Sequence, residues 1–391
     1  MADSVVHFAR GGLKISPPLS LYIHLPWCVK KCPYCDFNSH AAQGIPEAAY
    51  IDALLLDLEQ ALPDIWGRKI HTVFFGGGTP SLFSAAGIDR ILTGVRTLTP
   101  LAPNAEITLE ANPGTVEAAR FAGFREAGVT RVSLGIQSFN PQHLKALGRI
   151  HDDTEARRAA GLAATHFDTF NLDLMFALPG QTLEQALADV DAALSFQPPH
   201  LSAYHLTLEP NTPFGHTAPS NLPDEDVAAD MQLAIEARLI EAGMQHYETS
   251  AYARPQHASR HNLNYWQFGD YLGIGAGAHS KLSFHDRILR QMRTKHPQQY
   301  MDAVKQGTHL ADTRTLTRND LPFEFMMNAL RLNEGVPTAL FEERTGLPLI
   351  VCSTALAQAR ARGLLLPDPM RLQPTLLGQR YLNDLLELFL P

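Results

Sequence analysis

The chain has 391 residues, of which 45% are hydrophobic and 18% charged, with a formal net charge of −8. This length predicts two or three domains of roughly 100–200 residues, or an α/β barrel of about 250 residues with a further domain. The acidic balance and the lack of a long basic run argue against nucleic-acid binding. Residues 1–12 lack an apolar signal-peptide core, and no window approaches 18 uninterrupted apolar residues, so we expect a cytoplasmic protein without a membrane span.

Short β-rich runs, each followed by a helical pattern, fill the first half of the chain. Strands that alternate with amphipathic helices, such as Glu47–Leu62, Val116–Ala127 and Leu183–Ser195, are typical of βαβ units and a parallel sheet. Six such units predict an α/β fold with a partial (β/α)6 barrel or a strongly curved open sheet. The predicted strands are Leu21–Leu25, Thr72–Phe75, Ile107–Glu110, Arg131–Leu134, Phe170–Met175 and Leu201–Leu206.

This rhythm ends after Leu206. A proline-rich polar loop, Glu209 to Glu225, precedes a predicted helix from Asp226 to Ala242 and a segment rich in aromatic residues, histidine and glycine, His246 to Ser280. We place a domain boundary near residue 300, which gives domains 1–300 and 301–391. The second domain is predicted to contain helices Leu321–Leu332, Pro337–Thr345, Ile350–Arg362 and Pro374–Leu388, with a small hairpin at Gly363–Gln373.

These helices and the hairpin resemble a winged-helix fold, which often binds DNA. From Ala311 to Pro391, however, eight Arg and no Lys stand against nine Asp or Glu, which does not suit a phosphate-binding surface. We therefore expect no nucleic-acid partner. Cys352, on one of the predicted helices, is interpreted as a small buried hydrophobic residue.

The other three cysteines lie within eight residues, directly after the first predicted strand. Cys28, Cys32 and Cys35 have the spacing C-x3-C-x2-C. In a reducing compartment, clustered cysteines indicate metal or redox chemistry rather than disulfides. Three thiolates on one loop can each bind a corner of a [4Fe–4S] cluster, and the open fourth iron can be chelated by S-adenosylmethionine (SAM). The alternatives are unrelated buried cysteines or a zinc site, which would need a fourth ligand such as His24 or His40.

The sequence around these cysteines, Tyr22–Phe37, resembles the radical SAM superfamily, and within it the oxygen-independent coproporphyrinogen III oxidase group. It is most similar to the haem chaperone (HemW) branch of that group. In the oxidases the motif continues as C-x3-C-x2-C-x-C after an N-terminal extension, whereas here Phe37 takes the last position and about twenty residues precede the first strand. The resemblance extends into the C-terminal domain, which in this family covers the barrel mouth. It implies a [4Fe–4S] cluster and SAM as cofactors.

Polar residues follow several predicted strands, at the strand ends where (β/α) barrels bind their ligands. Glycines 76–78 allow close approach of a ligand to the backbone, although tight turns use such runs too. Glu110 could accept hydrogen bonds from a ribose diol, or it could be an ordinary surface carboxylate. Asp173 lies within a strand, where a buried carboxylate needs partners. The resemblance implies SAM binding by Tyr22, Gly77, Gly78, Thr79, Glu110, Gln137, Arg149 and Asp173.

The run His261–Trp266 lies outside the barrel pattern and precedes the glycine-rich stretch Tyr271–His279, which we expect to be flexible. By themselves, these residues favour a packed aromatic corner. The pattern H-N-x-x-Y-W, however, resembles the haem-binding motif of the haem chaperone branch. It implies an axial imidazole from His261 and flat apolar contacts from Tyr265 and Trp266. Competing ligands are His24, His257 and His279.

Three functions are compatible with this resemblance. The first is a haem chaperone that delivers haem to acceptor proteins, with an electron donor to the cluster as a further partner. The second is oxidative decarboxylation of coproporphyrinogen III, and a third is another radical SAM reaction. Phe37, the short N-terminal region and the run His261–Trp266 favour the chaperone. SAM cleavage, the identity of the acceptor, a homodimer and peripheral membrane association are left open.

Overall fold

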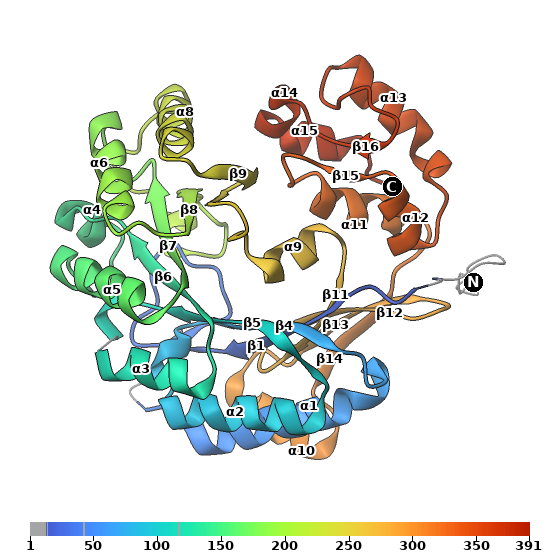
Figure 1. The fold of residues 1–391 in the computed structure, drawn as a ribbon, viewed down its shortest axis with the longest axis horizontal. Coiled ribbons are helices and arrows are strands. Elements are labelled where there is room, and N and C mark those ends of the chain that lie inside the picture. Colours follow the sequence, from blue (N-terminus) through green and yellow to red (C-terminus); the bar gives the residue numbers. More distant parts are fainter. Residues whose placement is uncertain (1–12, 14, 42–43, 116–117) are drawn as a thin grey trace.

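A twelve-stranded sheet dominates the computed structural model, which describes residues 13, 15–41, 44–115 and 118–391 (Figure 1). Residues 1–12, in which we expect no signal-peptide core, lie outside the described residues. The centre of the sheet is parallel, in the order β1-β4-β5-β6-β7-β8, which confirms the six predicted strands. These strands are β1 (Leu19–Leu25), β4 (Ile70–Gly77), β5 (Leu101–Ala111), β6 (Arg131–Gln137), β7 (Thr169–Phe176) and β8 (His200–His205).

Helices cover the outer face of this curved sheet (Figure 1). Along β4 the side chains of Val73 and Phe75 are fully buried in the main apolar core, whereas that of Phe74 is partly exposed. This period-two alternation separates a helix-covered face from an inner face that remains partly open, as a partial barrel requires. The helices of this half are α1 (Glu47–Ile65), α2 (Ala85–Leu98), α3 (Ala118–Ala127), α4 (Pro141–Ala146), α5 (Asp153–His166), α6 (Leu183–Leu194), α7 (Pro213–His216) and α8 (Glu225–Glu241), with one-turn 3-10 helices at Pro80–Leu82 and Pro113–Thr115.

Additional strands that the sequence analysis did not predict extend the sheet at both edges. On one side β11 pairs parallel to β1 and is followed by the antiparallel strands β12, β13 and β14; on the other side β10 and β9 follow β8. Two short strands, β2 and β3, pair beside the end of β1. Their bounds are β2 (Trp27–Cys28), β3 (His40–Ala41), β9 (Gln245–Glu248), β10 (Ala251–Ala253), β11 (Asp270–Ile274), β12 (His279–Ser283), β13 (Ile288–Arg293) and β14 (Leu310–Thr315).

The expectation of a flexible glycine-rich stretch at Tyr271–His279 is wrong. Most of this stretch is buried, and it forms β11 and the turn into β12. A Cβ atom on Gly273 would lie 2.1 Å from the carbonyl oxygen of His279, and one on Gly275 would lie 2.5 Å from that of His24. These glycines therefore allow backbones to pack closely. In a sequence alone, a glycine run that serves close packing cannot be distinguished from one that serves flexibility.

The C-terminal helices and a two-stranded ribbon pack around a second apolar core. Cys352 belongs to that core and is 3% exposed, which agrees with its interpretation as a buried hydrophobic residue. The bridge between Leu365 and Pro374 closes the predicted hairpin. The elements are α11 (Asp320–Ala329), β15 (Val336–Pro337), α12 (Ala339–Thr345), a 3-10 turn at Leu349–Cys352, α13 (Ser353–Ala361), β16 (Arg371–Leu372), α14 (Leu376–Arg380) and α15 (Leu382–Glu387).

The expected domain boundary near residue 300 falls inside α10 (Pro297–Gln306), and the large sheet continues to Thr315. The second apolar core takes most of its residues from Leu316 onward. We therefore propose that the C-terminal domain begins near residue 316. None of the helices in the described part of the chain is long and apolar enough to cross a membrane.

Candidate functional site: a cysteine loop at the barrel end

The three clustered cysteines lie on one loop that begins at the C-terminal end of β1. All three side chains are half-buried, and the backbone N–H of Cys35 donates to the carbonyl of Cys32 at 3.2 Å. The hydroxyl of Thr79 lies 3.5 Å from the sulfur of Cys28, and Nη1 of Arg149 lies 3.6 Å from that of Cys32. Burial raises the pKa values of the Cys28 and Cys35 thiols. The loop therefore offers soft ligands that would lose their protons on binding metal.

The donor set fits an iron–sulfur cluster better than a zinc ion. Within the described residues, no three His, Cys, Asp or Glu side chains converge on a position for a single metal ion. In a cubane cluster each thiolate binds a separate iron. Both ring nitrogens of His24 are engaged: Nδ1 accepts from the Tyr22 hydroxyl at 3.0 Å, and Nε2–H donates to the carbonyl of Asn38 at 2.8 Å. His24 is therefore not positioned as the fourth ligand of a zinc site.

A small cavity separates the cysteine loop from the barrel. Its volume of about 20 Å³ admits little more than one water molecule. The cavity connects the cysteine loop to Thr79 and Asn112, which follow β4 and β5, and to Arg149, which follows α4. It is lined by Val29, Lys30, Cys32, Thr79, Asn112, Arg149 and Ile150.

The glycine run at the end of β4 is required by close packing against the cysteine loop. A Cβ atom on Gly77, whose φ is +117°, would lie 2.5 Å from the imidazole of His24. A Cβ atom on Gly78 would lie 2.5 Å from the carbonyl oxygen of Trp27. Any larger residue would displace the segment that leads into Cys28, so these glycines position the loop as well as exposing backbone N–H groups.

Glu110 reaches this glycine run from β5. Its carboxyl accepts a hydrogen bond from the backbone N–H of Gly77 at 3.3 Å. Burial, followed by the nearby carboxylate of Asp173, raises the pKa of Glu110 to about 8. The carboxyl is therefore neutral at pH 7 without a ligand. Hydrogen-bond donors from a bound ribose would favour its charged form, since hydrogen bonds to a carboxylate lower its pKa.

The carboxylate of Asp173, on β7, has hydrogen-bond donors beside it, as a buried carboxylate requires. Its oxygens accept from the Ser133 hydroxyl at 3.1 Å and from the Asn171 amide at 2.7 Å. Burial nevertheless raises the pKa of Asp173. Tyr22, Glu110, Gln137 and Asp173 are all half-buried, which matches positions on the open inner face of the barrel.

Arg149 joins the cysteine loop to β6. Its guanidinium donates to the carbonyl of Gly135 at 2.7 Å and to the side chain of Asn112. The Asn112 amide in turn donates to the hydroxyl of Thr79 at 2.8 Å. Gln137, at the end of β6, has a φ of +69°, and such a backbone in a residue other than glycine often marks a functional position. Asn112 was not among the residues predicted from the sequence, although a polar residue just after a strand end was the available signal.

The segment implied to bind haem lies apart from the cysteine loop. It forms α9 (Arg260–Trp266), which lies between the barrel and the C-terminal domain in Figure 1. His261 is 1% exposed: Nδ1 lies 2.8 Å from the Thr72 hydroxyl, and Nε2 lies 3.0 Å from that of Tyr265. Because Thr72 donates its own proton to Ser20, Nδ1–H is the donor to Thr72 and Nε2 accepts from Tyr265. Burial lowers the pKa of His261 to about 3.

The curved parallel sheet, with a three-cysteine loop after its first strand and polar residues at its strand ends, defines a radical SAM protein. The model of the radical SAM superfamily matches residues 22–193, and that of the HemN C-terminal domain matches residues 316–381. The chain belongs to the HemW family of heme chaperones. It is 52% identical over 377 residues to the heme chaperone HemW of Escherichia coli (strain K12), covering 96% of this chain and 98% of that protein.

More distant relatives extend the similarity to animals and to a solved enzyme. The chain is 35% identical over 381 residues to the mitochondrial radical S-adenosyl methionine domain-containing protein 1 of Bos taurus, with 94% of this chain and 86% of that protein covered. The solved coproporphyrinogen III oxidase (HemN) from Escherichia coli has a TM-score of 0.81 and 25% identity, covering 96% of this chain and 90% of that one. The fold is therefore shared between the chaperones and an oxidase.

Proposed function

We propose that this protein binds haem and delivers it to haem-requiring acceptor proteins in the cytoplasm. The observation that carries the proposal is the similarity over nearly the full chain to proteins named heme chaperones. Phe37 supports it, because the oxidases are expected to have a fourth cysteine at that position. Further proposed partners are an electron donor to the cluster and, under some conditions, a membrane surface or a second copy of the chain.

We further propose that Cys28, Cys32 and Cys35 hold a [4Fe–4S] cluster and that SAM binds beside it. When bound, the cluster and SAM together supply a one-electron redox site. Arg149 would hold the loop at Cys32 and place a positive charge beside the cluster sulfurs. Glu110 would accept the ribose hydroxyls. Tyr22, Gln137 and Asp173 would form the polar inner wall, while Gly77, Gly78 and Thr79 allow close approach to the backbone.

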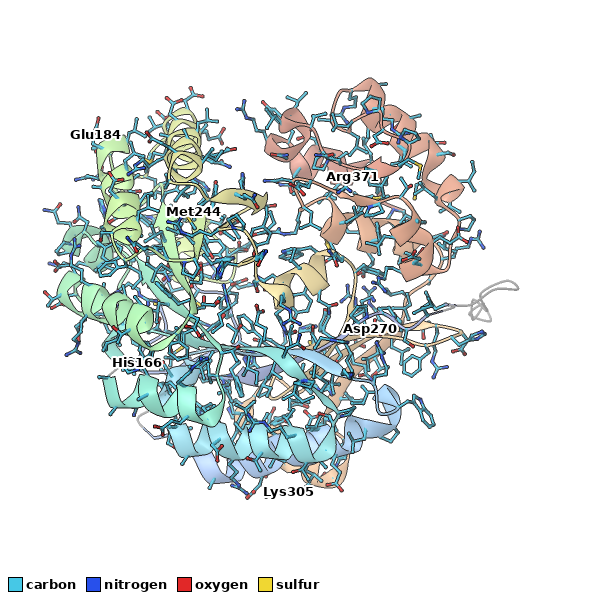
Figure 2. The ribbon with its side chains drawn as sticks, in the orientation of Figure 1. His166, Glu184, Met244, Asp270, Lys305 and Arg371 are labelled. Carbon is cyan, nitrogen blue, oxygen red and sulfur yellow. The ribbon has the colours of Figure 1, made fainter. Side chains whose placement is uncertain are left out.

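Replacing Glu110 by glutamine is expected to weaken SAM binding by roughly ten- to a hundredfold, because a charge-assisted hydrogen bond contributes about 1.5–3 kcal/mol. Isothermal titration of the cluster-loaded protein measures this effect. The control is Glu184→Gln on the exposed surface of α6 (Figure 2), which should bind SAM like the wild type. Unchanged affinity in Glu110→Gln would remove the ribose role.

The same variant should be more stable than the wild type at pH 8 in the absence of SAM. The pKa of Glu110 rises from 4.5 to about 8 on folding, so the folded protein retains a proton that the unfolded chain releases. Wild-type stability should therefore fall as the pH rises through that range, and glutamine cannot lose a proton. Thermal melts at pH 5 and pH 8 should show the variant's advantage growing with pH; equal advantage at both would contradict the assignment.

The protein is expected not to decarboxylate coproporphyrinogen III under anaerobic, reducing conditions. Phe37 stands where the oxidases are expected to have a further cysteine. Product analysis by liquid chromatography, with coproporphyrinogen III oxidase from Escherichia coli as the positive control, measures turnover. Formation of protoporphyrinogen would favour the second function, and haem titration of the same preparation tests the first.

Within this function, we propose that the segment of α9 takes part in haem binding, with His261, Tyr265 and Trp266 as the residues that the family pattern indicates. In the structure, Nε2 of His261 accepts a hydrogen bond from Tyr265, and the ring is enclosed. Direct ligation of iron would therefore require Tyr265 to move. The side chain of Trp266 packs against the guanidinium of Arg331 at 4.3 Å.

A further inference from the structure

A cavity of about 690 Å³ lies between the beginning of β1, the connection from α1 to β4, and α12 of the C-terminal domain. Figure 1 shows α12 above the N-terminal end of β1. The volume lies within the range of about 300–1,000 Å³ typical of pockets for cofactor-sized ligands. Since the cysteine loop follows the other end of β1, this cavity is separate from the cluster site.

The walls of the cavity combine apolar surface with an accessible imidazole. Pro17, Pro18, Leu19 and Ala339 line it, and Ile15 lies there with 74% of its surface exposed. His71, exposed on β4, is the histidine of the lining, and it makes no hydrogen bond among the described residues. Partial burial, followed by the charges of Lys69 and Arg260, lowers the pKa of His71. A lowered pKa favours the neutral imidazole, which is the form that binds iron.

Basic side chains from both domains also line the cavity. Arg68 is fixed by an ion pair with the buried Asp270 at 2.8 Å and by a hydrogen bond to the carbonyl of Pro17. Lys69 is exposed. Arg344, on α12, is half-buried and forms no hydrogen bond or ion pair within the described residues; its Nε is buried without an acceptor. A half-buried guanidinium without an acceptor would be stabilised by hydrogen bonds to an anionic ligand.

Burial lowers the pKa of Arg344, and the charges of Glu343 and Asp270 partly oppose this shift, but no acidic residue of the lining forms an ion pair with Arg344 among the described residues. Glu342 and Glu343 lie on the same helix as Arg344, but both are exposed and pair with no base at ion-pair distance among the described residues. Solvent screens exposed charges more strongly than partly buried ones. The cavity thus has an apolar wall, one imidazole that makes no side-chain hydrogen bond among the described residues, and basic groups that can bind carboxylates.

We propose that this interdomain cavity is the haem site, with His71 as the axial ligand and with Lys69 and Arg344 binding the propionates. This inference rests on the proposed function, because it gives the position at which the chaperone would hold its haem. It also gives the motif of α9 a structural role. His261 bonds to Thr72, the residue after His71, so the motif positions the strand that presents the ligand. In that arrangement His261 is a positioning residue, and its hydrogen bonds remain intact when haem binds.

The first test is haem titration of the full-length, cluster-loaded protein, followed by the position of the Soret band. His71→Ala is expected to weaken haem binding at least tenfold and to remove the spectrum of an imidazole ligand, and added free imidazole should restore that spectrum. The matched control is His166→Ala on α5, at the far side of the barrel (Figure 2), which should match the wild type. If His71→Ala binds haem with the wild-type spectrum and affinity, the site is wrong while the chaperone function stands. If the wild type itself binds no haem, the function fails.

A second test addresses the propionates. Arg344→Gln and Lys69→Gln should each weaken haem binding by roughly five- to tenfold and should leave binding of haem dimethyl ester unchanged, because the ester lacks the carboxylates. Cluster absorbance and thermal melting confirm that the variants are folded. An equal loss for haem and its ester, or no loss for either, would overturn the assignment of these two residues.

Discussion

Cys32→Ala is expected to abolish cluster assembly, whereas the wild type should hold about four irons and four sulfides per chain after anaerobic reconstitution. Cys28, Cys32 and Cys35 are the clustered thiols of the described structure, and removing any one leaves two ligands on the loop. With two thiolates, two irons of the cubane would lack a protein ligand. Iron and sulfide analysis, together with the broad absorption near about 400 nm of such clusters, measures the loss.

The control for this experiment is Cys352→Ala. Cys352 lies in the apolar core of the C-terminal domain, where burial raises the pKa of its thiol to about 11. Its replacement should cost some stability and leave the iron content at the wild-type value. Loss of the cluster in Cys352→Ala, or its retention in Cys32→Ala, would show that the ligand assignment is incorrect.

The second large effect is expected for His261→Ala, which should lower the free energy of unfolding by about 2–4 kcal/mol. The change opens a cavity in a closed site and leaves the hydroxyls of Thr72 and Tyr265 without their ring partners. Thermal or denaturant unfolding measures this loss. His279→Ala is the matched control, because His279 is exposed and should tolerate the change.

Haem affinity of the same variants separates the two roles open to His261. The family pattern predicts weaker haem binding in His261→Ala than after the same change at His257 or His279. His261→Gln can restore a hydrogen bond to Thr72 or Tyr265 but is a poor iron ligand. Recovery of haem binding and of the imidazole spectrum in His261→Gln would show a positioning role. Failure to recover in a stably folded His261→Gln would show direct ligation.

The main parallel sheet was predictable because its signals are local. Thr72–Phe75 and Phe170–Met175 are short β-rich runs beside amphipathic helices, and the period of each pattern identifies its element. The additional strands were not predictable on the same basis. Gly273 and Gly275 lower the apparent strand preference of β11. Glycine is required there because folding brings the backbones of His279 and His24 too close to leave room for a Cβ atom.

The sequence alone determined that three thiols share one short loop, because the spacing of Cys28, Cys32 and Cys35 fixes this whatever surrounds them, and it predicts their role as cluster ligands. Only the tertiary structure decided the surroundings of the histidines. His261 has the pattern of a ligand, but packing of α9 on β4 encloses it, whereas His71 has no motif and lies in an interdomain cavity. Burial and cavities arise where elements distant in the chain meet, so no local pattern records them.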